Sequence, residues 1–211
     1  MKKVSIALMV CLLLSISVLS EGASITTTDL NDIIAAGGQL VPIPGAEGSM
    51  LNSLSGPYGV TISFNTSVEH LIVGSLWDSW ASTYGNPIGL DILHYDGLNS
   101  MTLSFSKNIN AFGFELQPNL KSTFSYTMTL SDGTTQTQAV DGDGGAKTFG
   151  FTGGDVSSIS IINTVPDSDD GFAIGRMYLS SPGAVPEPST FLLLGAGVGG
   201  LVLMRRKARK Q

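Results

Sequence analysis

The chain has 211 residues, of which 17 are acidic and 11 are basic, and its formal net charge is −6. Between Ser24 and Val185 the imbalance is larger, because this span holds fifteen acidic side chains against four basic ones. Binding of nucleic-acid phosphates requires clustered Lys and Arg, so the composition argues against a nucleic-acid partner.

The N-terminal segment has the pattern of a secretory signal peptide. Two lysines precede an apolar run from Val4 to Leu19, and small residues follow. Cleavage after Ser20 and cleavage after Gly22 both fit this pattern, and an uncleaved N-terminal anchor is the alternative. We therefore assign residues 1–22 to a signal peptide. Its removal takes away Cys11, the single cysteine, so the mature protein has no disulfide, thiolate metal ligand or cysteine nucleophile.

Residues 23–183 form the predicted exported domain, and their pattern is that of an all-β fold. Only Asp29–Ala36 has a helical pattern, with Thr28 as the candidate N-cap and a glycine pair as the stop signal. Elsewhere apolar and polar residues alternate with a period of two, which predicts half-buried strands. The predicted strands are residues 58–64, 68–73, 88–94, 101–105, 112–116, 124–130, 134–140, 156–162 and 172–179.

The connections between these strands predict how they pair. Asp132-Gly133 marks a tight two-residue hairpin turn. Short strands joined by polar turns predict an antiparallel two-sheet sandwich that is jelly-roll-like, in a single domain without a Pro-rich linker. We expect an N-terminal signal helix and a C-terminal transmembrane helix to flank this sandwich.

Both tryptophans of the chain lie in one segment, "LWDSWASTYGNP", together with Tyr84. Planar aromatic rings can stack on sugar faces, so Trp77, Trp80 and Tyr84 are candidates for a glycan-binding platform. The alternative, which we favour, is that the tryptophans anchor a long connection onto the sandwich, because buried aromatic residues dominate core energetics.

Acidic residues near the last predicted strand are candidates for a calcium site. Asp167, Asp169 and Asp170 could offer oxygen ligands to Ca²⁺, although acidic turns are more often simply solvated. Asp141 and Asp143 do not match an EF-hand loop, because Gly145 and Thr152 stand where that loop needs an oxygen ligand and a glutamate. No other cofactor is indicated.

The sequence contains no recognisable catalytic motif, and we predict that the protein is not an enzyme. A Gly-x-Ser-x-Gly elbow, a His-Glu-x-x-His motif and a phosphate loop are all missing. Glu69 and His70 are neighbours in a predicted strand and therefore point to opposite faces. Glu69 and Glu115 remain a candidate pair of glycosidase carboxylates, should the fold bring them together.

The C-terminus has three parts in a fixed order. Pro186, Glu187 and Pro188 come first, and the apolar residues 190–204 follow as a predicted transmembrane helix. The helix is short, since its uncharged core from residue 191 to 204 spans about 21 Å against about 30 Å of hydrocarbon. A basic stop follows, and the positive-inside bias keeps it cytoplasmic and places the predicted domain outside. This basic stop consists of Arg205, Arg206, Lys207, Arg209 and Lys210.

This three-part tail, from Val185 to Lys210, resembles the PEP-CTERM sorting signal of Gram-negative bacteria. The resemblance implies recognition by an exosortase in the inner membrane, removal of the helix near Pro-Glu-Pro, and delivery to the cell surface or extracellular matrix. The two prolines would hold the cleavage segment extended and outside any helix, as a peptidase requires. A plain C-terminal membrane tail with a proline-bearing linker is the alternative.

The domain itself resembles the extracellular β-sandwich domains that are often found ahead of PEP-CTERM tails. The stretches "INAFGFELQP", "SISII" and "DDGFAIGRMYL" carry this resemblance. Several such domains have an aspartate in the closing strand, where this chain has Gly175, so a ligand or calcium role of that aspartate does not transfer.

Together these features predict an exported protein that passes through an inner-membrane intermediate. We expect a non-catalytic binding or structural module associated with exopolysaccharide in a biofilm matrix. A secreted glycan-active enzyme is the alternative function.

Overall fold

The computed structural model describes residues 23–97, 99–164 and 171–180. The predicted signal peptide, the sorting motif, the transmembrane helix, the basic stop and the candidate calcium ligands Asp167, Asp169 and Asp170 lie outside these residues. In the described part, no helix is both long and apolar enough to cross a membrane.

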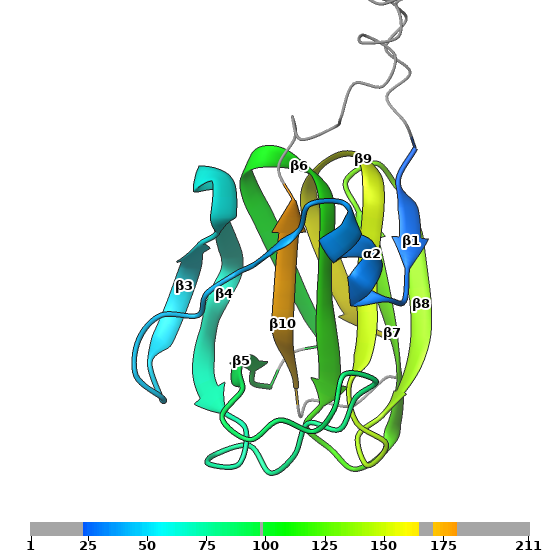
Figure 1. The fold of residues 1–211 in the computed structure, drawn as a ribbon. Helices are drawn as coiled ribbons and strands as arrows, with labels where there is room; N and C mark the ends of the chain where they lie inside the picture. Colours follow the sequence, from blue (N-terminus) through cyan, green and yellow to red (C-terminus); the bar gives the residue numbers. More distant parts are fainter. Residues whose placement is uncertain (1–22, 98, 165–170, 181–211) are drawn as a thin grey trace, which may run out of the picture. The chain divides into compact units, whose positions relative to one another are not determined.

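The described residues confirm the predicted all-β, antiparallel architecture, with one short helix (Figure 1). The helix α2 begins at Leu30, and Asp29 rather than Thr28 is its N-cap, because the Asp29 side chain accepts a hydrogen bond from the backbone N–H of Asn31. The elements are β1 (Ile25–Thr27), α2 (Leu30–Ala35), β2 (Gln39–Leu40), β3 (Met50–Ser55), the 3₁₀ turn η1 (Pro57–Gly59), β4 (Thr61–Ile72), β5 (Asp91–Tyr95), β6 (Ser100–Pro118), β7 (Thr123–Leu130), β8 (Thr135–Asp141), β9 (Lys147–Asn163) and β10 (Phe172–Ser180).

Two pairs of strands that the sequence predicts as separate are continuous. The predicted strands 58–64 and 68–73 fall on one strand, β4, which begins only at Thr61 because residues 57–59 form η1, and 101–105 and 112–116 are both parts of β6. The expectation of a break was wrong because an interruption of the alternation can be accommodated by a β-bulge, which shifts the register without ending the strand. β6 shows such shifts between Ser104 and Ile109 and between Ile109 and Ala111.

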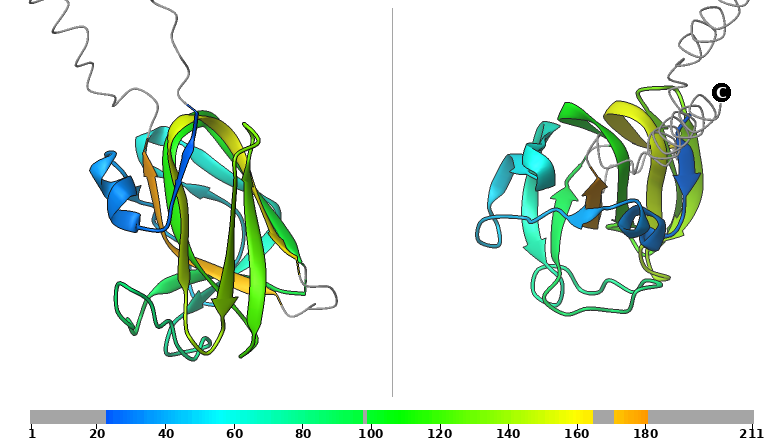
Figure 2. Two further views of the ribbon diagram at one scale, coloured as in Figure 1. Left: turned by 90° about the vertical axis from the view of Figure 1, so that its right-hand side faces the viewer. Right: turned by 45° about the horizontal axis from the view of Figure 1, so that its top comes forward.

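These bulges allow one hydrogen-bonded sheet to fold over the core. The strand order is β2-β10-β5-β4-β6-β9-β7-β8, and a further pairing joins β10 to β6. The first half of β6 pairs with the second half of β9, and its second half pairs with the first half of β9. The strands β3, β4, β6, β9, β7 and β8 thus form one side of the body, and β10 with β5 and the other halves of β4, β6 and β9 form the opposite side (Figure 2). A division into two separate sheets stays a prediction, since the described strands belong to one network.

The core lies between these two sides. Its centre is a set of fully buried aromatic rings, of which Phe114 and Phe149 stack with their centroids 5.9 Å apart. Alternating positions of β6, β7 and β9 supply most of the other buried side chains, as the period of two predicts. The remaining positions of these strands point outward, either to solvent or to the segments that cover β10.

The helix α2 packs on the outer surface of the side that contains β10 and β5, because two glycines leave space for it there. Gly113 and Gly150 are paired directly across β6 and β9. A Cβ atom at Gly113 would lie 2.7 Å from Cγ1 of Ile33, and one at Gly150 would lie 3.3 Å from Cδ1 of the same side chain. The two Phe-Gly-Phe triplets of the sequence, residues 112–114 and 149–151, therefore form the surface on which the helix packs.

Candidate functional site

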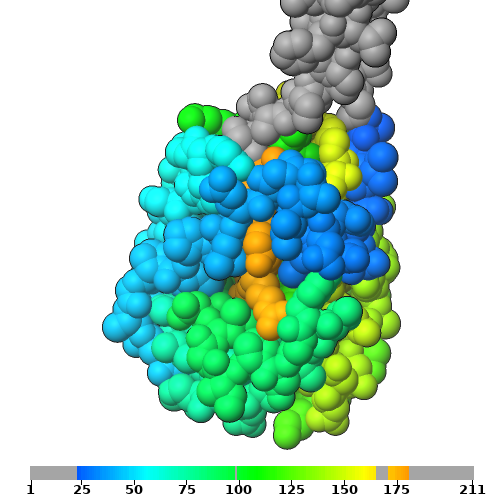
Figure 3. Space-filling view, in the orientation of Figure 1, coloured from blue at the N-terminus to red at the C-terminus, as the bar shows by residue number. Residues whose placement is uncertain are grey.

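The connection between β4 and β5, residues 73–90, crosses the outer side of β5, β10 and β6 without a helix or a regular strand (Figure 1). Its first turn is held by Glu47, whose carboxylate accepts hydrogen bonds from the Ser75 hydroxyl at 2.8 Å and from the backbone N–H of Ile72 at 3.0 Å. The Ser75 hydrogen bond lowers the pKa of Glu47, since it favours the ionised carboxylate. In Figure 3 the blue N-terminal segment lies around the upper part of the orange strand β10, and the green connection lies around its lower part.

Trp80 is the deepest anchor of this connection. Its ring is fully buried, and its indole Nε1–H donates a hydrogen bond to Oε2 of Glu115 at 2.7 Å. The ring lies over Gly175, where a Cβ atom would stand 3.3 Å from Cζ2 of Trp80. Glu115 is itself buried, and Nε of Arg176 lies 3.5 Å from the same carboxylate oxygen. A buried carboxylate needs such partners, because desolvation strongly disfavours an unpaired charge.

Tyr84 joins the connection to the N-terminus of α2. Its hydroxyl donates a hydrogen bond to the Asp29 carboxylate and accepts one from the backbone N–H of Leu30 at 2.6 Å. The guanidinium of Arg176 lies 5.9 Å from the centre of the Tyr84 ring. Burial raises the pKa of Tyr84, and the hydrogen bond from Tyr84 lowers the pKa of Asp29. Tyr84 therefore links the connection 73–90 to α2, and these two segments together cover the outer surface of the strands around β10.

The three aromatic residues proposed as a glycan platform do not present a common exposed surface. Trp80 is fully buried, Trp77 is 7% exposed, and the Tyr84 hydroxyl is occupied by α2. The rings of Trp77 and Trp80 are tilted by 59° with their centroids 6.3 Å apart. This arrangement agrees with the alternative that the tryptophans anchor the connection.

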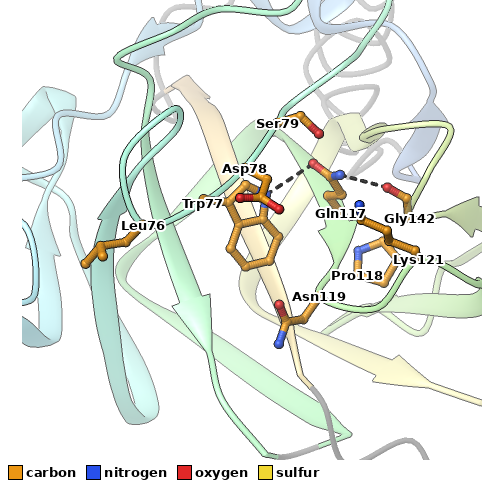
Figure 4. A pocket seen from close by; sticks show the side chains of 9 residues that line it. All are labelled: Leu76, Trp77, Asp78, Ser79, Gln117, Pro118, Asn119, Lys121 and Gly142. Carbon is orange, nitrogen blue, oxygen red and sulfur yellow. Dashed lines mark hydrogen bonds between the residues drawn. The ribbon is translucent and has the colours of Figure 1, made fainter.

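Trp77 alone borders a surface groove, which has a volume of about 160 Å³ (Figure 4). Buried Gln117 holds the floor together, since its Oε1 accepts a hydrogen bond from Nε1 of Trp77 at 3.4 Å and its Nε2 donates one to the carbonyl of Gly142 at 3.0 Å. Exposed polar side chains of the same connection and of the segment that follows β6 line the groove beside the ring. The groove is lined by Leu76, Trp77, Asp78, Ser79, Gln117, Pro118, Asn119, Lys121 and Gly142.

The candidate acid–base residues fall on two different faces. His70 is buried, and its Nε2 lies 2.8 Å from Oδ1 of Asp91. On the other face, Nδ1 of His94 lies 3.9 Å from Oε2 of Glu69. Burial lowers the pKa of His94, whose ring packs 5.4 Å from that of Trp77.

Glu69 and Glu115 share a face but are separated by the width of several strands. The register places Glu69 opposite His94 on β5 and Glu115 opposite Gly175 on β10. Glu69 on β4 is therefore three strand spacings, or about 14 Å, from β6, where Glu115 lies. Glycosidase carboxylates are about 5–9.5 Å apart, and the Glu115 carboxylate faces Trp80 and Arg176.

The sequence reasoning missed Glu115, Gln117 and Arg176 as partners of the aromatic connection. A usable signal for the first two was present, because they are polar residues in the otherwise apolar stretch from residue 111 to 118. Among residues 23–97, 99–164 and 171–180, no group of three or more acidic, histidine or cysteine side chains could hold a metal ion.

Comparison with known proteins adds one specific match. Residues 184–207 match the family model of the PEP-CTERM protein-sorting motif, so the chain carries the C-terminal signal that implies an exported surface protein. A search of the curated proteins finds no significant match.

The solved structures that are similar to this chain are only distantly so. One is described as a peptidoglycan O-acetylesterase (19% identity, TM-score 0.35), and it matches over 68% of this chain and 34% of its own. Another is a CBM51 domain with its INT domain from Clostridium perfringens ZmpB, in complex with GlcNAc (12% identity, TM-score 0.39). It matches over 74% of this chain and 43% of its own. A third is the family 11 carbohydrate-binding module from Clostridium thermocellum with a mixed-linked tetrasaccharide (12% identity, TM-score 0.30). It matches over 65% of this chain and 98% of its own. This chain thus spans less than half of the first two.

Replacing Trp80 tests whether this ring anchors the connection. Trp80→Ala removes a fully buried ring and one donor of the Glu115 carboxylate, so we expect a loss of about 3–5 kcal/mol in the free energy of unfolding. Ile88→Ala is the matched control, because Ile88 lies in the same connection with 88% of its surface exposed and should change stability by about 0.5 kcal/mol or less. Urea titration followed by circular dichroism measures both. A Trp80→Ala cost as small as that of Ile88→Ala would show that the ring is not an anchor.

Proposed function

We propose that this protein is an exported component of the cell surface or extracellular matrix and that its β-domain binds exopolysaccharide without cleaving it. The sorting motif at residues 184–207 supports the route, through an exosortase in the inner membrane that removes the helix near Pro186. We also propose that the domain is a two-sheet, jelly-roll-like sandwich. In this proposal the sheet that folds over the core supplies the described part of both layers.

The groove beside Trp77 is the observation that carries the binding proposal. An aromatic edge at the floor offers an apolar contact for a sugar ring, and the surrounding polar groups offer donors and acceptors for its hydroxyls. Asp78 accepts, Lys121 donates, and the Asn119 amide does both. A site of this composition suits a single sugar unit at a chain end or a branch.

The arrangement of carboxylates supports binding rather than cleavage. Glu115 is committed to Trp80 and Arg176, and Glu69 is about three strand spacings away. A general acid and its partner must flank one glycosidic bond. A secreted glycan-active enzyme stays the second candidate function, for which the Glu69–His94 pair at 3.9 Å is the available acid–base couple.

Sugar binding in the groove is tested with the full chain in mild detergent and the exopolysaccharide of the producing cells. Asn119→Ala should weaken binding about 2- to 10-fold, the effect of one lost hydrogen bond, without changing the melting temperature, because Asn119 is exposed. Thr83→Ala, an exposed position in the same connection as Trp77, is the control and should bind like the wild type. Equal binding by all three proteins would refute the groove as the site. Release of soluble sugars with turnover would refute the non-catalytic role and favour the enzyme.

The sorting route is tested by the intact mass of the protein recovered from the cell surface. We expect a mass that lacks residues 1–22 and the tail beyond the Pro-Glu-Pro motif, because both signals are removed during export. A surface protein that still contains residues 191–211 would contradict sorting by an exosortase and would support a plain membrane anchor.

A further inference from the structure

The outer face of the strands β3, β4, β6, β9, β7 and β8 consists almost entirely of hydroxyl-bearing side chains. These positions alternate with core residues such as Leu103, Ile161 and Met128, so they point away from the core. They are exposed or partly exposed. They are Ser53, Ser55, Thr61, Ser63, Asn65, Ser100, Thr102, Ser104, Ser106, Ser125, Thr127, Thr129, Thr135, Thr137, Ala139, Ser158, Ser160 and Ile162, and we call them the hydroxyl face.

Strand register arranges these side chains in rows across the sheet. One row runs through Ser53, Ser63, Ser104 and Ser158, each directly opposite the next. A second row runs through Thr102, Ser160, Thr129 and Thr135. Neighbours within a row are about 4.8 Å apart, and rows follow at about 6.7 Å along the strands, so the face is a two-dimensional lattice of hydroxyl groups.

The eighteen residues of the hydroxyl face include no charged side chain, and the exposed Asp141 stands beyond Ala139 at the end of β8, although the described body is strongly acidic. An uncharged surface neither attracts a charged polymer nor gains by charge pairing, so its partner is neutral. The face also lacks the aromatic and Arg anchors on which most protein–protein interfaces depend. Its hydroxyls can both donate and accept hydrogen bonds, which suits a partner that carries hydroxyls itself.

A rigid lattice also favours a rigid partner. Threonine is stiff about χ1, and the backbone of a paired strand is already ordered, so little conformational entropy is lost on binding. Some groups are fixed further, as in the hydrogen bond of 2.8 Å between the hydroxyls of Thr127 and Thr137. Individually weak contacts then add up only when the partner is extended and repeats along its length.

We propose that the hydroxyl face is a second polysaccharide-binding surface, which lies flat against a neutral, insoluble polysaccharide. This inference rests on the proposed function and names the polymer class for it. The groove beside Trp77 contacts single sugar units, and the hydroxyl face contacts the surface of a fibre.

The test is co-sedimentation of the full chain, in mild detergent, with microcrystalline cellulose and with curdlan, two neutral insoluble glucans. The double variant Thr129→Lys/Ser160→Lys places two charges on adjacent strands of the lattice, and we expect it to reduce the partition onto at least one glucan by about tenfold or more, since each charge would be desolvated without a partner. Thr83→Lys/Ile88→Lys adds the same charge at exposed positions of the connection 73–90 and should stay within about twofold of the wild type. Melting temperatures check that both variants are folded.

Three results would overturn the proposal. The first is a wild-type protein that sediments with neither glucan. The second is a lattice variant that binds as well as the wild type; if Asn119→Ala still weakens exopolysaccharide binding, the groove and the proposed function stand without the hydroxyl face. The third is loss of self-association in the lattice variant with unchanged glucan binding, which would make the face an interface between copies of this chain.

Discussion

The connection 73–90 and α2 cover the side of the domain that contains β10, which we call the closed side. This cover depends on the contact between the Trp80 indole and the buried carboxylate of Glu115. An unpaired carboxylate is strongly disfavoured in this buried position, and its partners here are the indole N–H and the guanidinium of Arg176. The same contact presses the Trp80 ring onto Gly175 and so fixes the connection 73–90 across β10. Because the ring is buried, the outer surface of β10 beneath it is not open to a ligand.

This closure determines where ligands can reach the domain. Tyr84 links the connection to α2, and α2 rests on the paired glycines Gly113 and Gly150, so the cover continues along the strands. Two surfaces of the described residues stay accessible: the groove at the margin, which Trp77 and Asn119 both line, and the hydroxyl face on the opposite side. The proposed function places both surfaces on polysaccharide, one for a sugar unit and one for a fibre.

Sequence reasoning predicts β4 to β8, β10 and the second half of β9 at least in part, because a period of two is a local property, but it misses β1, β2, β3 and the first half of β9. It also predicts the sorting motif, whose three parts are contiguous and which the family model matches at residues 184–207. It does not predict that Glu115 meets Trp80, because the partners are 35 positions apart and only the fold brings them together. The rows of the hydroxyl face likewise depend on register between strands that are distant in sequence, such as Ser63 and Ser104. The continuous course of β4 and β6 was missed for a similar reason, since a bulge and a turn look alike in the alternation.

The most direct test of this account uses the two indole N–H groups, because the chain has only two tryptophans. Hydrogen exchange of both groups is followed by NMR on the full chain in mild detergent. The account predicts that the Nε1–H of Trp80 exchanges only on global unfolding, since it is buried and bonded to Glu115, and that the Nε1–H of Trp77 at the margin of the groove exchanges faster. Rapid exchange of the Trp80 indole in the folded protein would contradict the closed side and return this ring to the candidates for an exposed glycan platform.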